Sequence, residues 1–346
     1  MFTKPLAPMV LIDDASRRVL RLVLGVALAL VIAYGFGLAV PHLSVLIVLM
    51  LLSPAGPPLN LIKGAMLALV LMVLTGAGIV LVPLLQHYAY AAILLIIVAL
   101  FAIFFLGIKT RHPLLNVLLM TFTMIPVAGL QSQALVQGLV MSLAGGVLLA
   151  SFCSMLAHLT LPDLAPAPSK PKPAPSDVAA SWLALQGVVI IVPVLLLALA
   201  NPALYLAAIM KTATLGQQAS RVHAKEAARE LLGSTLLGAL LASLIWAGLS
   251  LSPTLWMFTL WVALAFLWMA LRFYRVAPSA YAPSYWLNVM ITVLIFLGPA
   301  VQDSANGKDV LSAALIRLAL FVAVAIYACV SIYALEALRE WVSKRR

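Results

Sequence analysis

Two basic residues, Lys211 and Arg317, lie well inside long apolar segments, where a charged side chain needs a special reason to exist. Lys211 is nine residues beyond Pro202, which begins its segment, so a helical rise of 1.5 Å per residue places it roughly 13 Å below that end. Arg317 is eight residues beyond Asp309, roughly 12 Å below the same face. A charge at this depth costs at least about 2.5 to 3.5 kcal/mol, so it usually faces a cavity or a partner. The two cations could share one layer of the structure.

The compensation of these two charges is the central question that the sequence raises. No Asp or Glu lies comparably deep in any apolar segment, so compensation must come from backbone carbonyls, polar side chains, water or an anionic substrate. We infer an anionic substrate. Two alternatives stay open: Arg317 reaches lipid headgroups or pairs with Asp303 or Asp309, and Lys211 is simply neutral.

The elements that must position these cations are twelve apolar segments, each near the length of about 20 residues that crosses a bilayer as a helix. We place them at 20–40, 43–61, 64–85, 89–108, 113–130, 133–157, 182–200, 202–218, 227–250, 254–271, 284–301 and 310–337. The composition, 65% hydrophobic and 9% charged, leaves too few polar residues to cover a soluble globule of 346 residues. The predicted fold class is therefore an all-α polytopic membrane protein.

Basic residues occupy alternate connections between the segments, from Arg17 and Arg18 before the first segment to Arg345 and Arg346 after the last. By the positive-inside rule these connections and both termini are cytoplasmic, and only Lys308 falls in an outer loop. The net charge of +11 is scattered over short loops and does not form one basic face, which argues against a nucleic-acid partner.

The chain divides into two six-helix halves, residues 1–159 and 181–346, joined by a Pro-rich cytoplasmic linker at 160–180. Pro41-His42-Leu43 in the first half corresponds to Pro202-Ala203-Leu204 in the second, and Leu115-Asn116-Val117 corresponds to Leu287-Asn288-Val289. Because six is even, the two repeats are parallel and related by an axis along the membrane normal. A pathway between the halves is expected.

A break in the second segment, where prolines follow Ser53, indicates where a substrate would bind. Pro residues cannot continue a regular helix, and the counterpart segment in the second half turns polar after about three turns. The alternative is that the second segment ends at Ser53 and a proline loop follows. The residues assigned to the break are Pro54, Gly56, Pro57 and Pro58.

The candidate substrate ligands are the two deep cations, hydroxyl groups near the break and in the counterpart segment, and one indole that could stack on an aromatic ring. These residues are Lys211, Arg317, Ser53, Thr212, Thr214 and Trp261. Protonatable groups near the inner mouth could relay protons, although a solvated cytoplasmic face is the plainer interpretation of the same segment. These are Glu226, Glu230 and His223.

Other chemistries lack the residues that they need. Cys153 and Cys329 are predicted to pack as small apolar side chains, so neither a disulfide framework nor a metal site is expected. There is no GxxxxGK[ST] nucleotide motif, no HExxH, and no paired carboxylates at membrane depth. The sequence therefore predicts no cofactor and no enzyme.

An SRRVLR lead into the first segment, a proline-closed first hairpin and the stretch ARELLGSTLLGALLA within tandem six-helix halves resemble the fusaric-acid-resistance and aromatic-acid-exporter (FUSC-like) superfamily. More narrowly, the chain looks like the compact branch of bacterial inner-membrane proteins. The resemblance implies efflux of aromatic carboxylic acids, commonly with a periplasmic adaptor and an outer-membrane channel as partners. Larger members carry a cytosolic domain between the halves, where this chain has only the linker. Basic residues line the pores of the similar plant malate channels.

Three functions follow from the residues and the resemblance together. The first is a bacterial inner-membrane exporter that is driven by the proton gradient and carries small organic anions, aromatic carboxylates in particular, or related toxic compounds. The second is a passive organic-anion channel, and the third is a membrane anchor for a periplasmic adaptor that transports nothing. The oligomeric state stays open between a homo-oligomer and a single chain, because two halves already form a pseudo-dimer.

Overall fold

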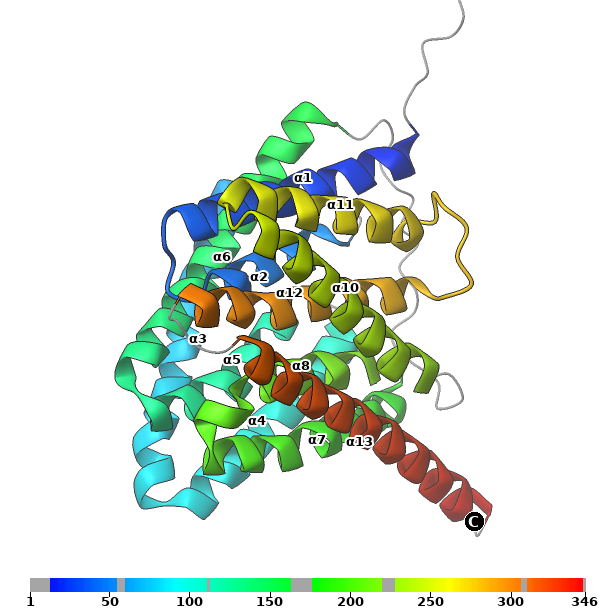
Figure 1. Cartoon of the computed structure of the whole chain (residues 1–346). Coiled ribbons are helices and arrows are strands. Elements are labelled where there is room, and N and C mark those ends of the chain that lie inside the picture. The colour runs from blue at the N-terminus through cyan, green and yellow to red at the C-terminus, as the bar shows by residue number, and fades with distance from the viewer. Residues whose placement is uncertain are drawn as a thin grey trace, which may run out of the picture.

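The structure is a computed structural model that describes residues 13–54, 60–110, 113–162, 176–219, 228–305 and 310–344 (Figure 1). These residues form twelve α-helices and one π-helical turn, with no strand among them. Each predicted apolar segment falls mainly on one α-helix, although 43–61 also reaches the first residue of α3 and 227–250 includes the π-helical turn. The elements are α1 (Asp14–Gly35), α2 (Pro41–Leu52), α3 (Leu61–His87), α4 (Ala89–Thr110), α5 (Pro113–Gln131), α6 (Gln133–Thr160), α7 (Asp177–Ala200), α8 (Pro202–Ala219), η1 (Ala228–Leu232), α10 (Gly233–Leu251), α11 (Leu255–Phe273), α12 (Pro283–Ala305) and α13 (Val310–Lys344).

Nine helical stretches in the described residues are long and apolar enough to cross a membrane, which makes the chain a multi-pass helical membrane protein. Two further apolar helices are shorter, namely α2 and the part of α5 at Val117–Gln131. The polar helix α8 meets neither description. Helices satisfy their own backbone hydrogen bonds, which is why an apolar chain in lipid adopts them.

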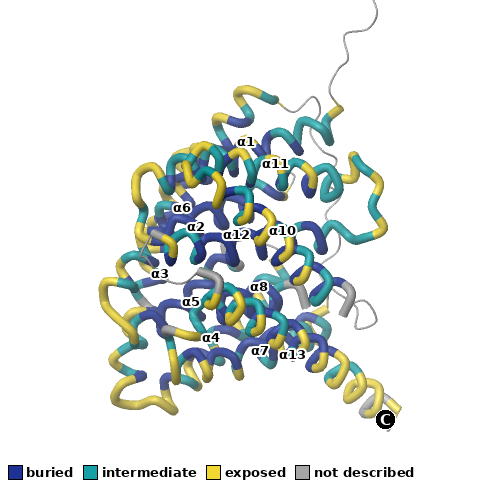
Figure 2. Tube along the Cα trace, viewed as in Figure 1, coloured by how far each residue is buried: buried dark blue, intermediate teal, exposed yellow. Residues whose placement is uncertain are grey.

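The helices before and after the linker pack in the same pattern. The contacts α1–α2, α2–α6 and α3–α5 have the counterparts α7–α8, α8–α13 and α10–α12. Between the two sets, α1 packs on α11 as α7 packs on α4, and α2 packs on α12 as α8 packs on α5. We call α2, α5, α8 and α12 the central helices, and Figure 2 shows that they are largely buried.

The break predicted after Ser53 is present as the end of a helix. Helix α2 begins at Pro41, where proline is well tolerated, and ends at Leu52, just before Ser53 and Pro54. The backbone carbonyl of Ser53 accepts a hydrogen bond from the hydroxyl of Tyr274 at 3.0 Å, so this freed carbonyl has a partner. The alternative that the segment simply ends at Ser53 therefore describes the structure better than a span over 43–61.

The remaining residues assigned to the break, Gly56, Pro57 and Pro58, lie outside the described residues, as do 163–175 of the linker. The counterpart helix α8 has no break, because it continues as an α-helix through its polar stretch to Ala219. Its polar side chains are thus held at regular helical positions.

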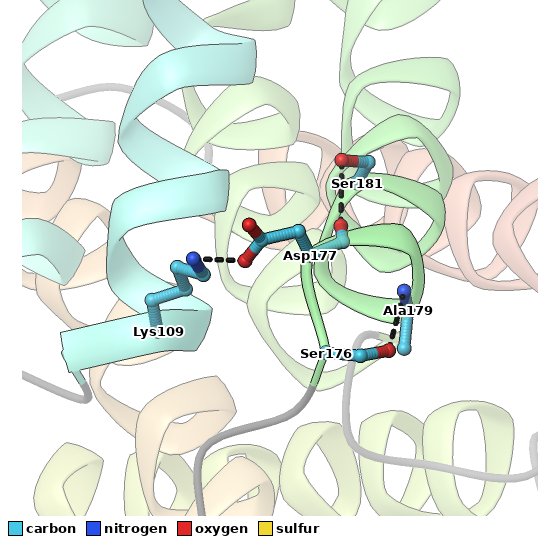
Figure 3. Close-up of polar contacts among 5 residues, drawn as sticks. All are labelled: Lys109, Ser176, Asp177, Ala179 and Ser181. Atoms are coloured by element: carbon cyan, nitrogen blue, oxygen red, sulfur yellow. Dashed lines mark hydrogen bonds and ion pairs between the residues drawn. The ribbon is translucent and has the colours of Figure 1, made fainter.

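A polar contact joins the two sets of helices where α4 ends and α7 begins (Figure 3). The ammonium group of Lys109 forms an ion pair with the carboxylate of Asp177. Helix α7 is capped at the same place, since the hydroxyl of Ser176 accepts from the backbone N–H of Ala179 at 3.4 Å. The hydroxyl of Ser181 donates to the carbonyl of Asp177 within the first turns of the helix at 2.8 Å. The Asp177 side chain is 74% exposed, so the pair stabilises this contact by at most about 1 kcal/mol.

The close approach of α4 and α7 depends on a glycine. A Cβ added at Gly187 would lie 2.6 Å from a ring carbon of Phe104, whereas a Cβ at Gly145 of α6 would meet nothing within 4 Å. We predict that Gly187→Ala lowers stability by about 1 to 3 kcal/mol through overpacking, despite a gain in helix propensity of up to about 1 kcal/mol. Gly145→Ala gains the propensity alone and should unfold at the same temperature as wild type or a higher one. Thermal unfolding in detergent measures the melting temperatures of both variants. A Gly187→Ala variant that melts at the same temperature as Gly145→Ala would contradict the described contact.

Candidate functional site

Lys211 lies at the middle of α8 and is completely buried. Its ammonium nitrogen donates to the side-chain oxygen of Asn288 at 3.0 Å and to the hydroxyl of Thr292 at 2.6 Å. Asn288 and Thr292 are one helical turn apart and therefore share a face of α12. Both partners are neutral, and no described carboxylate forms an ion pair with Lys211. The site is thus a buried amine held only by neutral oxygen atoms.

The two partners of Lys211 are themselves fixed by hydrogen bonds. The Thr292 hydroxyl donates to the backbone carbonyl of Asn288 at 2.6 Å, which leaves its lone pairs for the ammonium group. The amide nitrogen of Asn288 donates to the hydroxyl of Ser234 on α10. Helix α10 can approach α12 this closely because Gly238, one turn after Ser234, faces Thr292, where a Cβ would lie 2.6 Å from the Thr292 side chain.

The hydrogen-bonded chain continues from Ser234 to the π-helical turn that precedes α10. Ser234 donates to the backbone carbonyl of Glu230, and the Glu230 carboxylate accepts from the hydroxyl of Ser284 at 2.7 Å. Glu230 is 8% exposed, and π-helical turns are frequent at functional sites. An amide has no titratable proton at ordinary pH, so Asn288 interrupts any proton relay along this chain. The other two residues predicted for proton coupling, Glu226 and His223, lie outside the described residues.

Thr212 and Thr214 are buried neighbours of Lys211 in sequence, but their hydroxyl groups bond to their own helix. Thr212 donates to the carbonyl of Ala208 at 2.6 Å, and Thr214 donates to the carbonyl of Lys211 at 2.7 Å. Such local bonds are the usual state of a hydroxyl in a membrane helix. These two residues stay predictions as substrate ligands.

Ser53 and Trp261 lie elsewhere in the structure. Ser53 donates to the carbonyl of Met50 at 3.3 Å at the end of α2. The indole of Trp261 packs on Gly248 of α10, where an added Cβ would lie 2.7 Å from the ring. The described contacts of neither residue include Lys211, so no shared site is formed by these contacts.

Lys211 on α8 and Arg317 on α13 contact α12 at different levels, so the two cations do not share one layer. Arg317 forms an ion pair with Asp303, which is one of the alternatives that the sequence left open. Asp303 is eleven residues after Thr292, a separation of roughly 16 Å along a helix. The carboxylate of Asp303 binds Arg317 in the last turn of α12, while Asn288 and Thr292 bind Lys211 in the first half of that helix.

Sequence reasoning did not select Asn288, Thr292 or Ser234 as site residues. Asn288 and Thr292 have the four-residue spacing of one helical face, and this is the signal that could have identified them. Their pairing with a lysine 77 and 81 residues away depends on how α8 packs against α12.

A matched pair of threonines tests the described geometry. Thr292→Val removes an acceptor from a buried ammonium group and should lower stability by about 1.5 to 3 kcal/mol. Thr212→Val removes a hydroxyl that bonds only to its own helix and should lower stability by about 0.6 kcal/mol or less. In a Lys211→Met background, the extra loss from Thr292→Val should vanish. Unfolding of the purified protein by SDS in mixed micelles measures all four variants, and a loss that persists without Lys211 would refute the pairing.

Comparison with known proteins adds a match to the first part of the chain. Residues 18–157, which lie within α1 to α6, match the family described as protein of unknown function DUF2955. No curated protein and no solved structure matches the chain. Lys211 and its partners lie outside the matched residues, so the first six helices are similar to the DUF2955 family and the candidate site belongs to the helices that follow.

Proposed function

We propose that this protein exports small organic anions, aromatic carboxylates in particular, across the bacterial inner membrane, and that Lys211 binds the carboxylate. The observation that carries the proposal is the burial of Lys211 among neutral partners. An ammonium group has three donors, of which Asn288 and Thr292 take two. A carboxylate at the third donor would form a charge-assisted hydrogen bond and compensate the buried charge.

The packing pattern supports a transport pathway between two parallel six-helix repeats, residues 1–159 and 181–346, joined at 160–180. The recurrence of helix contacts before and after the linker agrees with such a repeat, and so does the match of the DUF2955 family to α1 through α6. In Figure 1, α1 begins and α13 ends at the same edge of the bundle, as a cytoplasmic location of both termini requires. The pathway would run along the central helices.

The contents of the two repeats support a single anion site per chain. When Pro41 is aligned to Pro202, the residue that corresponds to Lys211 is Met50. When Asn116 is aligned to Asn288, the residue that corresponds to Thr292 is Met120. Both methionines are buried and apolar. Only the second half therefore offers a cation at this depth.

The energy source and the partners belong to the same proposal. The chain has no nucleotide-binding motif, which favours the proton gradient as the driving force. The resemblance to aromatic-acid exporters favours a periplasmic adaptor and an outer-membrane channel as partners. A passive channel and a membrane anchor that transports nothing are the competing functions that experiment must separate.

The proposed orientation can be tested with two introduced cysteines. Pro253 is exposed in the turn between α10 and α11, and Ala280 is exposed in the connection between α11 and α12. The native Cys153 and Cys329 are buried and should react little. A membrane-impermeant maleimide added to spheroplasts should label Pro253→Cys and leave Ala280→Cys unlabelled until the membrane is opened. The reverse pattern would invert the orientation.

The transport function can be tested with labelled benzoate in inverted membrane vesicles. Wild type should accumulate benzoate only with a proton gradient, and Lys211→Met should lose at least about 90% of this uptake, as expected when a charge-assisted hydrogen bond to the substrate is removed. Thr75→Val is the control, because the Thr75 hydroxyl bonds to the Met72 carbonyl of its own helix α3, and this variant should transport as wild type does. Flux that needs no gradient would indicate a channel, and gradient-driven uptake that survives Lys211→Met would exclude Lys211 as the anion ligand.

A further inference from the structure

Arginines gather where α1 begins and α11 ends. Helices α1 and α11 pack against each other, and Figure 1 shows that α1 begins at the edge of the bundle where α11 ends. Residues 13–21 and 270–282 contain five arginines, which are Arg17, Arg18 and Arg21 on α1 and Arg272 and Arg275 at the end of α11. The same two segments contain two carboxylates, Asp13 and Asp14, so five positive and two negative charges leave an excess of three positive charges.

Contacts at both ends of the helix pair fix this arrangement. The ring of Tyr34, near the end of α1, lies 5.1 Å from the ring of Phe258, in the first turns of α11. Two helices that pack with the end of one beside the start of the other are antiparallel, so the start of α1 lies beside the end of α11.

The residues around Ser53 confirm the same alignment at the other end. The hydroxyl of Tyr274, the residue after α11, donates to the carbonyl of Ser53 at 3.0 Å. The neighbouring Leu52 packs on Gly25 of α1, one helical turn from Arg21. Burial raises the pKa of the Tyr274 phenol, and the charges of Arg21 and Arg18 oppose this rise, which agrees with the contacts.

Arg272 is held in place without losing its charge. Its guanidinium carbon lies 4.0 Å from the centre of the Trp268 ring and 5.4 Å from that of Trp286. Its Nη1 donates to the backbone carbonyl of Trp268 at 2.9 Å. No described carboxylate forms an ion pair with Arg272. Because aromatic rings attract a cation but do not neutralise it, the other N–H donors of this side chain can bind an anionic group.

Arg275 has an unusual backbone. Its φ angle is +63°, and it is the one residue other than glycine with a positive φ in the described part of the chain. This position directly follows the last helical turns, where glycine is the usual residue because a Cβ is strained there. The side chain of Arg275 is exposed. Strain of this kind is found at functional sites, so an arginine here indicates a function for its charge.

An exposed apolar ridge on α11 leads to these two arginines. Trp256, Leu260, Leu264 and Trp268 follow one another at every fourth position and are between 39% and 71% exposed. Side chains four residues apart form a continuous ridge on a helix, and the next member of this ridge is Arg272. Since α11 is long and apolar enough to cross a membrane, the ridge changes from apolar to cationic where the helix reaches the membrane surface.

We propose that the end of α11 binds one anionic phospholipid, with its phosphate at Arg272 and Arg275 and an acyl chain along the ridge. The planar guanidinium group matches two phosphate oxygens, and four to eight basic residues at the end of a membrane helix are typical of anionic-lipid binding. In the proposed orientation this lipid lies in the inner leaflet. The lipid site goes beyond the proposed function, since it involves neither Lys211 nor the transported anion.

The bound phosphate would join the two halves of the chain. Helix α1 precedes the linker and α11 follows it, and the arginines at their adjacent ends repel one another. A phosphate at this place compensates that repulsion. We therefore expect an anionic lipid to raise the melting temperature of the protein, whereas a zwitterionic lipid should not.

The experiment is a titration of the purified full chain in detergent with dioleoylphosphatidylglycerol or dioleoylphosphatidylcholine, followed by native mass spectrometry. Wild type should bind one phosphatidylglycerol at least about tenfold more tightly than phosphatidylcholine, as expected for a charge-assisted contact. Arg272→Gln should weaken phosphatidylglycerol binding by about tenfold or more and leave phosphatidylcholine binding unchanged. The rise in melting temperature should disappear with it.

A glycine at position 275 separates a lipid ligand from a structural residue. Arg275→Gly relieves the backbone strain, so without lipid this variant should melt at the same temperature as wild type or a higher one. It should nevertheless bind phosphatidylglycerol about tenfold more weakly. Arg275→Lys keeps the charge and should preserve part of the binding. If Arg275 only ends the helix, Arg275→Gly should bind the lipid as wild type does, and the assignment of Arg275 fails.

Arg339→Gln is the matched control. Arg339 also lies over a tryptophan, with its guanidinium carbon 5.8 Å from the centre of the Trp182 ring, but it is near the end of α13, far from α1 in Figure 1. This variant should keep the preference for phosphatidylglycerol. Equal affinities of wild type for the two lipids would overturn the proposal, and so would a preference that survives both Arg272→Gln and Arg275→Gly. Displacement of the lipid by inorganic phosphate or benzoate at equal concentration would show a general anion site instead. None of these results bears on transport through Lys211.

Discussion

The hydrogen bonds from Lys211 to Asn288 and Thr292 set the arrangement of the helices around them. A lysine at this depth cannot face lipid without a penalty of a few kcal/mol, so α8 must lie inside the bundle. It packs there against α5, α7, α12 and α13. Gly238 brings α10 close enough to α12 for Ser234 to hold the amide of Asn288. One buried amine thus accounts for the position of α8 and for the polar surfaces that two neighbouring helices turn inward.

The pattern of helix contacts recurs before and after the linker, but the polar residues at corresponding positions differ. The helices before and after the linker make corresponding contacts, and the central helices of each set pack against those of the other. The polar residues are not repeated, since Met50 and Met120 occupy the positions that correspond to Lys211 and Thr292. Two proposed repeats could move as two similar bodies, whereas a single deep cation would give the proposed pathway one strong position for an anion.

Sequence periodicity and length predict most of the helices, although not the early end of α2, and they do not predict the partners of the candidate site residues. The predicted segment 202–218 differs from α8 by one residue, because the flanking polar residues and prolines mark helix ends clearly. The nearest acidic residue before Arg317 in the sequence is Asp309, yet the described partner of Arg317 is Asp303, on a different helix. The contact of Lys211 with α12 joins residues far apart in the chain, and no local pattern determines how two helices pack. For the same reason, the position of His42 against Gly298 is visible only in three dimensions.

The most direct test of this account is the distance between the bound carboxylate and the lysine nitrogen. Solid-state NMR can detect the dipolar coupling between carboxyl-¹³C benzoate and ¹⁵Nζ-labelled lysine in the reconstituted protein. The account predicts a coupling that corresponds to a hydrogen-bonded pair, with nitrogen and oxygen about 2.7 to 2.9 Å apart, and its disappearance in Lys211→Met. Benzoate that binds tightly without coupling to any lysine, or a coupling that persists in Lys211→Met, would contradict the central claim.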